Sequence, residues 1–253
     1  VCSSDLFGGA LPKQLLTLCG RPILQRSVDA FAGHERIADL VVALPPELAA
    51  APPDYLARQP KPLALVEGGE RRQDSVSRAL VLVPPQSDIV VIHDAVRPFV
   101  TAELISRTID AAERHGAAIA ALPATDTVKR ADDRRVIIDT IPRREIFLAQ
   151  TPQAFKVSVL REALSGSTEE ATDEAALVER AGYPVHLVDG DARNMKITSP
   201  DDLAAAERLI GGGAATLRIG NGYDLHRLVE GRRLDRKSTR LNSSHVSESR
   251  MPS

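Results

Sequence analysis

Short apolar runs rich in branched residues alternate along this chain with segments of helical period, and this alternation restricts the possible folds more than any other feature. The segments expected to form strands are residues 40–44, 63–66, 89–92, 117–122 and 185–188. Between them, residues 73–83 and 104–112 place apolar side chains on one helical face. Strands alternating with amphipathic helices are typical of an α/β fold, with a mostly parallel sheet covered by helices.

One stretch, residues 126–141, interrupts the alternation, because β-branched residues there flank a polar turn at Ala131, Asp132 and Asp133. The pattern predicts a β-hairpin arm that projects from the domain. A two-stranded arm is marginally stable in water by itself, so we expect a partner subunit of a homodimer to cover it. An ordinary surface hairpin is the alternative.

The composition excludes several classes of protein. With 32 Lys and Arg against 34 Asp and Glu, no global field would attract nucleic acid or an anionic membrane. Two cysteines, Cys2 and Cys19, are too few for a disulfide framework and fit a reducing cytoplasm. No apolar run approaches the roughly 18 residues of a membrane helix. We expect a cytoplasmic protein that binds neither nucleic acid nor membranes.

Composition also suggests where domains begin and end. The 253 residues, 43% of them hydrophobic, suffice for one large domain or one domain plus a fragment. Ser199 and Pro200 favour the start of a last helix that runs to about Ile210, and residues 211–215 form a glycine-rich linker. We expect a first domain at residues 8–210 and the start of a second at 216–234. Residues 1–7 and 235–253 are interpreted as non-native or disordered ends.

An acidic and a basic residue, Asp94 and Arg97, directly follow the expected strand at residues 89–92. Ligands of open α/β sheets bind beyond the carboxyl ends of the strands. Because an unpaired buried carboxylate is costly, Asp94 could serve a divalent metal or a sugar hydroxyl, and Arg97 could bind a phosphate. An ion pair between the two residues that only fastens the loop is the alternative.

Other residues could complete a phosphate site. Gly68 and Gly69 precede the helix that contains Ser75, and such a junction allows close backbone approach to an anion, although a simple turn explains it equally well. The dispersed cations that could bind phosphates are Lys13, Arg97, Arg143 and Lys196. They share one function only if the fold brings them together; otherwise each is a surface charge.

Seven motifs occur in the order and spacing of a known family. They are Leu11-Pro12-Lys13-Gln14, residues 68–76, residues 93–98, Asp126-Thr127-Val128-Lys129, Thr151-Pro152-Gln153, Thr172-Asp173-Glu174-Ala175 and Asn194-Met195-Lys196. Over residues 8–210 the chain resembles 2-C-methyl-D-erythritol 4-phosphate cytidylyltransferase, which implies a Rossmann-like nucleotidyltransferase fold. Residues 218–234 resemble the opening of 2-C-methyl-D-erythritol 2,4-cyclodiphosphate synthase, the domain that follows in the bifunctional fusion of the two enzymes.

The resemblance implies roles for individual residues. Those implied to bind CTP are Lys13, Gly68, Gly69, Ser75, Asp94, Ala95 and Lys196. Those implied to bind methylerythritol phosphate are Asp94, Arg97, Thr127, Arg143, Thr151 and Thr172. Lys13, Arg143 and Lys196 are expected to act directly in catalysis, and the resemblance implies that a homodimer partner supplies Arg143 and part of the arm.

In the implied reaction, the phosphate of methylerythritol phosphate attacks the α-phosphorus of CTP and pyrophosphate leaves. A phosphate monoester has a second pKa of about 6, so it is mostly dianionic at neutral pH and needs no general base. Lysines, arginines and Mg²⁺ then position the reactants and neutralise charge. The chain offers no Ser-His-Asp or Cys-His set, and this chemistry requires none.

The chain departs from the family's pattern in two places. The family opens with a strand and a glycine-rich loop that ends in an arginine, and residues 1–7 do not match that piece. We therefore expect this polypeptide to be weakly active or inactive. In the second unit, Asp224 and His226 match two zinc ligands of the synthase, but the third is absent from the sequence, so we expect Zn²⁺ only in a complete synthase domain.

Two other functions remain open from the sequence. One is a nucleotidyltransferase of the same fold that uses CTP or UTP with a different acceptor. The other is a non-catalytic, dimeric nucleotide-binding remnant. A dinucleotide-binding dehydrogenase is disfavoured, because no Gly-x-Gly-x-x-Gly motif occurs.

Overall fold

The computed structural model describes residues 13–166 and 171–211, all within the first of two units of the chain, Val1–Ala214. The strands are β1 (Thr17–Leu18), β2 (Arg21–Pro22), β3 (Leu40–Leu44), β4 (Leu63–Glu67), β5 (Ile89–Ile92), β6 (Ala117–Pro123), β7 (Val128–Ala131), β8 (Ile137–Ile141), β9 (Phe147–Lys156) and β10 (His186–Asp189). The helices are α1 (Ile23–Ala32), α2 (Pro46–Ala50), α3 (Asp54–Ala57), α4 (Arg72–Val81), α5 (Ala102–His115), α6 (Val157–Gly166), α7 (Glu174–Arg180) and α8 (Pro200–Gly211), with short 3-10 turns η1 (Lys13–Leu15) and η2 (Arg143–Glu145).

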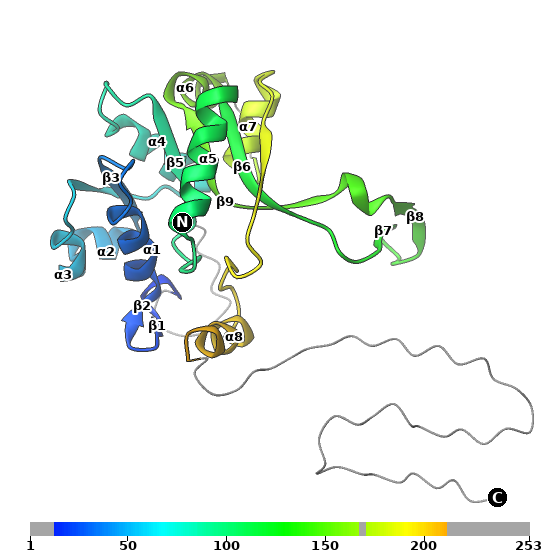
Figure 1. Ribbon diagram of the computed structural model, residues 1–253, viewed down its shortest axis with the longest axis horizontal. Helices are drawn as coiled ribbons and strands as arrows, with labels where there is room; N and C mark the ends of the chain where they lie inside the picture. The colour runs from blue at the N-terminus through cyan, green and yellow to red at the C-terminus, as the bar shows by residue number, and fades with distance from the viewer. Residues whose placement is uncertain (1–12, 167–170, 212–253) are drawn as a thin grey trace, which may run out of the picture. The chain divides into compact units, whose positions relative to one another are not determined.

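The central sheet has the strand order β10-β6-β9-β5, and β3 and β4 form a separate parallel pair (Figure 1). β10 runs parallel to β6, whereas β9 runs antiparallel to both β6 and β5. All five strands expected from the sequence are present, and the α/β fold is confirmed. The sequence did not predict β9, which occupies the middle of the sheet and reverses the direction of one strand.

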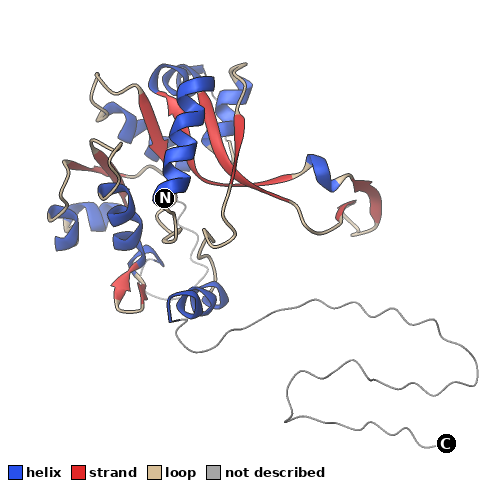
Figure 2. Ribbon diagram, in the orientation of Figure 1, coloured by secondary structure: helices blue, strands red, loops and turns tan. Residues whose placement is uncertain are grey.

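The side chains of β6 explain the layering. Ala117 and Ile119 pack with Phe155 and with residues of α6 and α7 on one face of the sheet. Ala118 and Ala120 point to the opposite face, where α5 covers them. Strand side chains alternate between faces, and alanine on the α5 side lets the helix approach closely. Figure 2 shows α5 lying across the red strands. The sheet is thus a rigid platform between two helical layers.

Local signals set the ends of the helices. The Thr101 hydroxyl accepts a hydrogen bond from the Leu104 amide at the start of α5, and Gly116, with φ +92°, ends it. At α8, the Ser199 hydroxyl accepts from the amide of Asp202 at 3.2 Å, so the expected cap is confirmed. No helix within the described ranges is long and apolar enough to cross a membrane.

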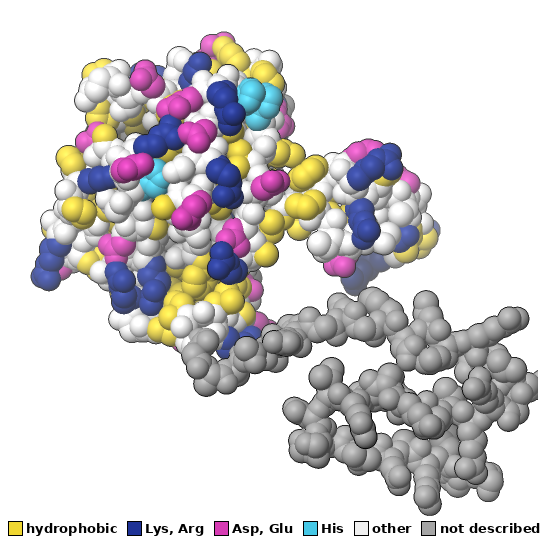
Figure 3. Space-filling view, in the orientation of Figure 1, with side chains coloured by type: hydrophobic (Ala, Val, Ile, Leu, Met, Phe, Trp, Pro, Cys, Tyr) yellow, Lys and Arg dark blue, Asp and Glu magenta, His cyan; other side chains and the backbone are white. Residues whose placement is uncertain are grey.

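The hairpin of β7 and β8 extends away from the sheet as an arm, as expected from the sequence (Figure 1). Apolar side chains gather where this arm leaves the body (Figure 3). The large exposed apolar residues of the arm and its base are Val136, Ile137, Ile138, Phe147 and Leu148. A cluster of this kind is unusual on the surface of a monomer and marks a surface suited to a partner.

The linker expected at residues 211–215 begins at least one residue later, because Gly211 is the last residue of α8. Residues 1–7, 212–215 and 216–253, with Asp224 and His226, lie outside the described residues.

Candidate active site

The carboxylate of Asp94 lies at the centre of a cluster of cations at the end of β5. Its Oδ2 atom is 3.3 Å from Nε of Arg97 and 3.2 Å from Nζ of Lys196, and its Oδ1 atom is 3.7 Å from Arg72. Burial acts to raise the pKa of Asp94, but the positive charges of Lys196, Arg72 and Arg97 hold it below its usual value. Three cations against two acids, Asp94 and the Glu174 that pairs with Arg72, leave a net positive site for an anion.

Arg97 is the most buried cation of this cluster. Its NH1 group donates to the carbonyl of Asn194 at 3.0 Å while Nε faces Asp94. Burial lowers the pKa of Arg97, although Asp94 opposes that effect. The ion pair that the sequence left open is therefore present in this structure, and it joins the β5 loop to the segment that carries Lys196.

Thr151, on β9, and His93 hold the loop that carries Asp94 in place. The Asp94 amide donates to the Thr151 hydroxyl at 3.0 Å, and this hydroxyl lies 2.9 Å from Nδ1 of His93. Nε2 of His93 lies 3.0 Å from the carbonyl of Arg97, which can only accept. These partners fit a neutral ring with its proton on Nε2. Burial lowers the pKa of His93 to about 4, in agreement with that state.

Gly68 and Gly69 form the turn between β4 and α4. The Gly69 amide donates to the hydroxyl of Ser75 at 3.0 Å, and the Gly68 amide donates to the carbonyl of Leu44 at 2.7 Å. A Cβ atom on Gly69 would lie 2.3 Å from Cβ of Asp74, so only glycine fits there without a shift. The backbone of α4 packs tightly on this turn, and Ser75 holds it in place.

An ion pair that the sequence did not single out joins α4 to α7. NH1 of Arg72 donates to Oε2 of Glu174, whose residue is 1% exposed. Burial raises the pKa of Glu174, and the charge of Arg72 opposes the shift. In the sequence, these two residues are marked only by their places at helix starts. Arg72 begins the helix after the two glycines, and Glu174 begins α7 after the cap Asp173.

These side chains border a cavity of about 680 Å³. Arg72, Ser75, Asp94 and Lys196 form its polar end. Strands β3 and β5 and helix α1 line much of the remainder. The further charged residues that line it are Arg36, Asp39, Asp88 and Glu113. In the part of the chain that the structure describes, β3 pairs only with β4 and β5 pairs only with β9, so the free edges of both strands belong to this cavity.

The structure brings together some of the expected site residues and separates others. Asp94, Arg97 and Lys196 converge. Thr151 accepts a hydrogen bond from the Asp94 amide, and the carbonyl of Ala95 accepts one from the Ser27 hydroxyl. Thr127 and Arg143 belong to the exposed arm, where Arg143 donates to the carbonyl of Thr125 at 2.7 Å; neither lines the cavity. Thr172 is exposed just before α7, and Lys13 begins η1.

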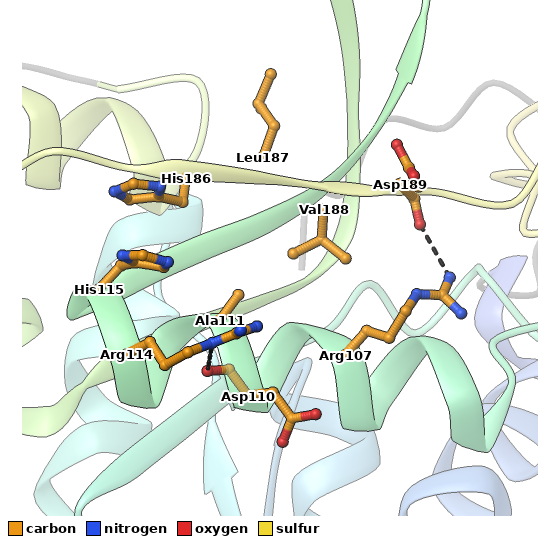
Figure 4. A pocket seen from close by; sticks show the side chains of 9 residues that line it. All are labelled: Arg107, Asp110, Ala111, Arg114, His115, His186, Leu187, Val188 and Asp189. Atoms are coloured by element: carbon orange, nitrogen blue, oxygen red, sulfur yellow. Dashed lines mark hydrogen bonds between the residues drawn. The ribbon is translucent and has the colours of Figure 1, made fainter.

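A shallower pocket of about 300 Å³ lies between α5 and β10 (Figure 4). The rings of His115 and His186 stack there with centroids 3.8 Å apart, and Arg107 and Arg114 donate to the backbone carbonyls of Asp189 and Asp110. Its cations thus bond to neighbouring backbone rather than converge on one point. Over the described ranges, no group of three or more His, Cys, Asp or Glu side chains could hold a metal ion.

The sequence and the fold of this chain are similar to those of known proteins. The family model for IspD: 2-C-methyl-D-erythritol 4-phosphate cytidylyltransferase matches residues 6–211. The chain is 42% identical over 205 residues to the 2-C-methyl-D-erythritol 4-phosphate cytidylyltransferase of Syntrophus aciditrophicus, covering 79% of this chain and 88% of that protein. It is 46% identical over 228 residues to the bifunctional enzyme IspD/IspF of Anaeromyxobacter dehalogenans, covering 88% of this chain.

This chain spans only 58% of the length of that bifunctional relative. Among solved structures, the crystal structure of 2-C-methyl-D-erythritol 4-phosphate cytidylyltransferase from Thermus thermophilus superposes with a TM-score of 0.69 at 39% identity. The match covers 78% of this chain and 93% of that one.

Proposed function

Since this chain belongs to the 2-C-methyl-D-erythritol 4-phosphate cytidylyltransferase family, we propose that it transfers CMP from CTP to 2-C-methyl-D-erythritol 4-phosphate. The products are 4-diphosphocytidyl-2-C-methyl-D-erythritol and pyrophosphate. One observation supports this proposal above the others: Asp94, Arg72, Arg97 and Lys196 meet beside one cavity, although they come from three separate parts of the sequence. The net positive charge of this cluster, three cations against Asp94 and Glu174, suits a triphosphate.

In the proposed step, an oxygen of the acceptor phosphate forms a bond to the α-phosphorus of CTP, and the bond from that phosphorus to the bridging oxygen breaks. The electron pair leaves with pyrophosphate. The acceptor is a dianion near neutral pH, so the enzyme's task is to bring two anions together and to balance their charge. His93 is no candidate base, because Nε2 faces the carbonyl of Arg97 and Nδ1 faces Thr151.

The proposed catalytic roles are assigned to Lys196 and Lys13. Lys196, with 44% of its side chain exposed, is the accessible cation beside Asp94 and would neutralise charge on the phosphates. Lys13 would add a second cation from η1. Asp94 and Ala95 would lie along the ribose and the acceptor, and the Gly68, Gly69 and Ser75 turn would face the base.

Mg²⁺ is the proposed metal cofactor. Magnesium binds through one or two carboxylates with substrate phosphates and water, rather than through a full set of protein ligands. The carboxylate of Asp94, which lines the cavity with Arg72 and Lys196, fits that mode as a single protein ligand. The ion would neutralise phosphate charge.

The active form is proposed to be a cytoplasmic homodimer in which the arm of one subunit reaches the site of the other. Arg143 and Thr127 do not line the cavity of their own chain, and exposed Ile137 and Ile138 offer an apolar contact surface on the arm. Thr172, Thr151 and Arg97 would complete the acceptor side. The greater length of the bifunctional relative supports the proposal that the native protein also carries a cyclodiphosphate synthase domain.

A coupled assay of pyrophosphate release from CTP tests the reaction. Addition of methylerythritol phosphate with Mg²⁺ should produce pyrophosphate at a low rate, as expected of a chain whose residues 1–7 do not match the family's opening loop. Lys196→Ala and Asp94→Asn should each lower kcat/KM further, by at least about a hundredfold. Lys156→Ala, at an exposed residue of β9, is the matched control and should retain activity.

The acceptor and the enzymatic class need separate measurements. Exclusive use of ribitol phosphate in an acceptor panel would replace methylerythritol phosphate as the substrate. CTP binding measured by calorimetry, without turnover on any acceptor, would instead identify a nucleotide-binding remnant.

A further inference from the structure

We propose that Glu174 is a positioning residue for nucleotide binding, which acts through Arg72 without touching the nucleotide. This inference rests on the proposed function, because it assumes that the cavity at Asp94 receives the phosphates of CTP. Glu174 is the first residue of α7 and does not line the cavity. The inference also assigns Arg72 a role in binding phosphate beside Lys196.

The guanidinium of Arg72 faces two acids at once. Its side chain is 20% exposed and lines the cavity. NH1 donates to Glu174, whereas NH2 stands 3.7 Å from Oδ1 of Asp94, which is longer than a hydrogen bond. One half of the guanidinium fork is therefore anchored, and the other half can donate to an anion that enters the cavity.

Glu174 is buried behind this arginine. Its side chain is 1% exposed, and its ion-pair partner in the described residues is Arg72. A buried carboxylate is costly unless it is paired, so Glu174 fixes the place of the arginine as much as the arginine neutralises it. The amide of Ala171 also donates to Oε1 of Gln73 at 3.3 Å, which holds the same turn of α4 against the segment before α7.

Asp94 and Glu174 compete for Arg72. Asp94 already has Arg97 and Lys196 at 3.3 and 3.2 Å. Without the carboxylate of Glu174, Arg72 would close the gap to Asp94 and pair with it fully. The arginine would then be lost as a donor to the ligand. Glu174 thus keeps the third cation of the cluster apart from the acid at its centre.

Charge alone predicts the opposite result. Removal of a negative charge near the cavity increases its positive potential and would by itself favour CTP. We expect the loss of the fixed Arg72 donor to lower CTP affinity by more than the added positive potential raises it. A donor that is already held in place loses no side-chain entropy on binding, whereas the effect of a distant charge is partly screened by salt. The direction of the change in CTP affinity therefore separates positioning from a general charge effect.

The test is a cycle of variants in the full chain, with equilibrium titrations of CTP and of cytidine. Glu174→Gln keeps the size of the side chain and removes its charge. It should weaken CTP binding about tenfold and leave cytidine binding unchanged, since cytidine has no phosphates. Glu162→Gln, which alters the exposed acid bonded to Tyr183, is the matched control and should change neither affinity.

The Arg72→Gln variant shows whether the effect passes through the arginine. It should weaken CTP binding to a similar extent, and Glu174→Gln added to it should cause no further loss. Glu174→Asp, which keeps the charge but shortens the side chain, keeps the test decisive if melting curves show that Glu174→Gln does not fold: it should also weaken CTP binding and leave cytidine binding unchanged.

Several outcomes would overturn the inference. They are unchanged or tighter CTP binding in Glu174→Gln, an equal loss for cytidine, or a further loss when the second change is added to Arg72→Gln. Failure of the wild-type chain to bind CTP would remove the proposed function as well. Normal wild-type binding with an unaffected Glu174→Gln variant would remove only this inference.

Discussion

The hydroxyl of Thr151 stands between the backbone amide of Asp94 and Nδ1 of His93, at 3.0 and 2.9 Å. One side chain from β9 thus fixes both the loop that carries the central acid and the ring that supports it. Thr151 is 4% exposed, so its partners have little access to water that could replace it.

Thr151→Val should therefore lower the free energy of unfolding by about 2 kcal/mol, because it keeps the shape of the side chain but leaves a buried amide and a buried ring nitrogen without a partner. Urea denaturation measures this loss. Thr151→Ser retains the hydroxyl and should lose much less; equal losses in both variants would show that the methyl group, not the hydroxyl, matters.

Stability should fall as pH is lowered from about 6.5 toward 4 through His93. The unfolded ring binds a proton near pH 6.5, whereas the native ring, with a pKa of about 4, does not, so acid favours unfolding across this window. A shift of that size corresponds to about 3 kcal/mol. Denaturation of wild type and His93→Gln at pH 7.5 and 4.5 should show a smaller acid loss in the variant.

Gly69→Ala should weaken CTP binding by about tenfold or more, because the new Cβ would meet Asp74 at 2.3 Å and push the turn away from α4. Gly166→Ala is the control, since nothing lies within 4 Å of a Cβ at that position. Calorimetry with CTP compares the two. Normal binding by Gly69→Ala would mean that the turn adapts or does not face the nucleotide.

Ile138→Asp should shift a dimer toward monomers in sedimentation experiments at micromolar concentration. Ile138 is 61% exposed on the arm, and a charge there would be costly to bury against a partner. Val81→Asp changes an 81% exposed apolar residue on α4, away from the arm, and should leave the distribution unchanged. A wild-type chain that sediments as a monomer would contradict the proposed assembly.

The sequence predicted those strands whose composition matches their burial. β3 and β5 are continuous apolar runs, and their observed bounds agree with those expected from the sequence. β9 was missed because its central residues include Gln150, Thr151, Pro152 and Gln153, a polar set that resembles a loop. Their burial depends on partners from distant segments, such as Asp173 for Gln153 and Asn194 for Thr151, which local patterns cannot reveal.

The sequence also predicted only part of the candidate site. Asp94, Arg97 and Lys196 were named from their motifs, and the structure brings them together. Arg72 and Glu174 lie within quoted motifs but received no role, because their importance comes from a contact across 102 positions of the chain. Arg143 and Thr127 were also named, but in this structure they lie on the arm and do not line the cavity.

The separation of β3 and β4 from the four-stranded sheet bears on how the domain opens. β3 and β4 share backbone hydrogen bonds with each other, whereas within residues 13–166 and 171–211 neither strand shares any with the four-stranded sheet. Native-state hydrogen exchange should accordingly find β3 and β4 opening as a cooperative unit of lower protection than β6 and β9. Uniform protection across both groups would show that the packing unites them into a single foldon.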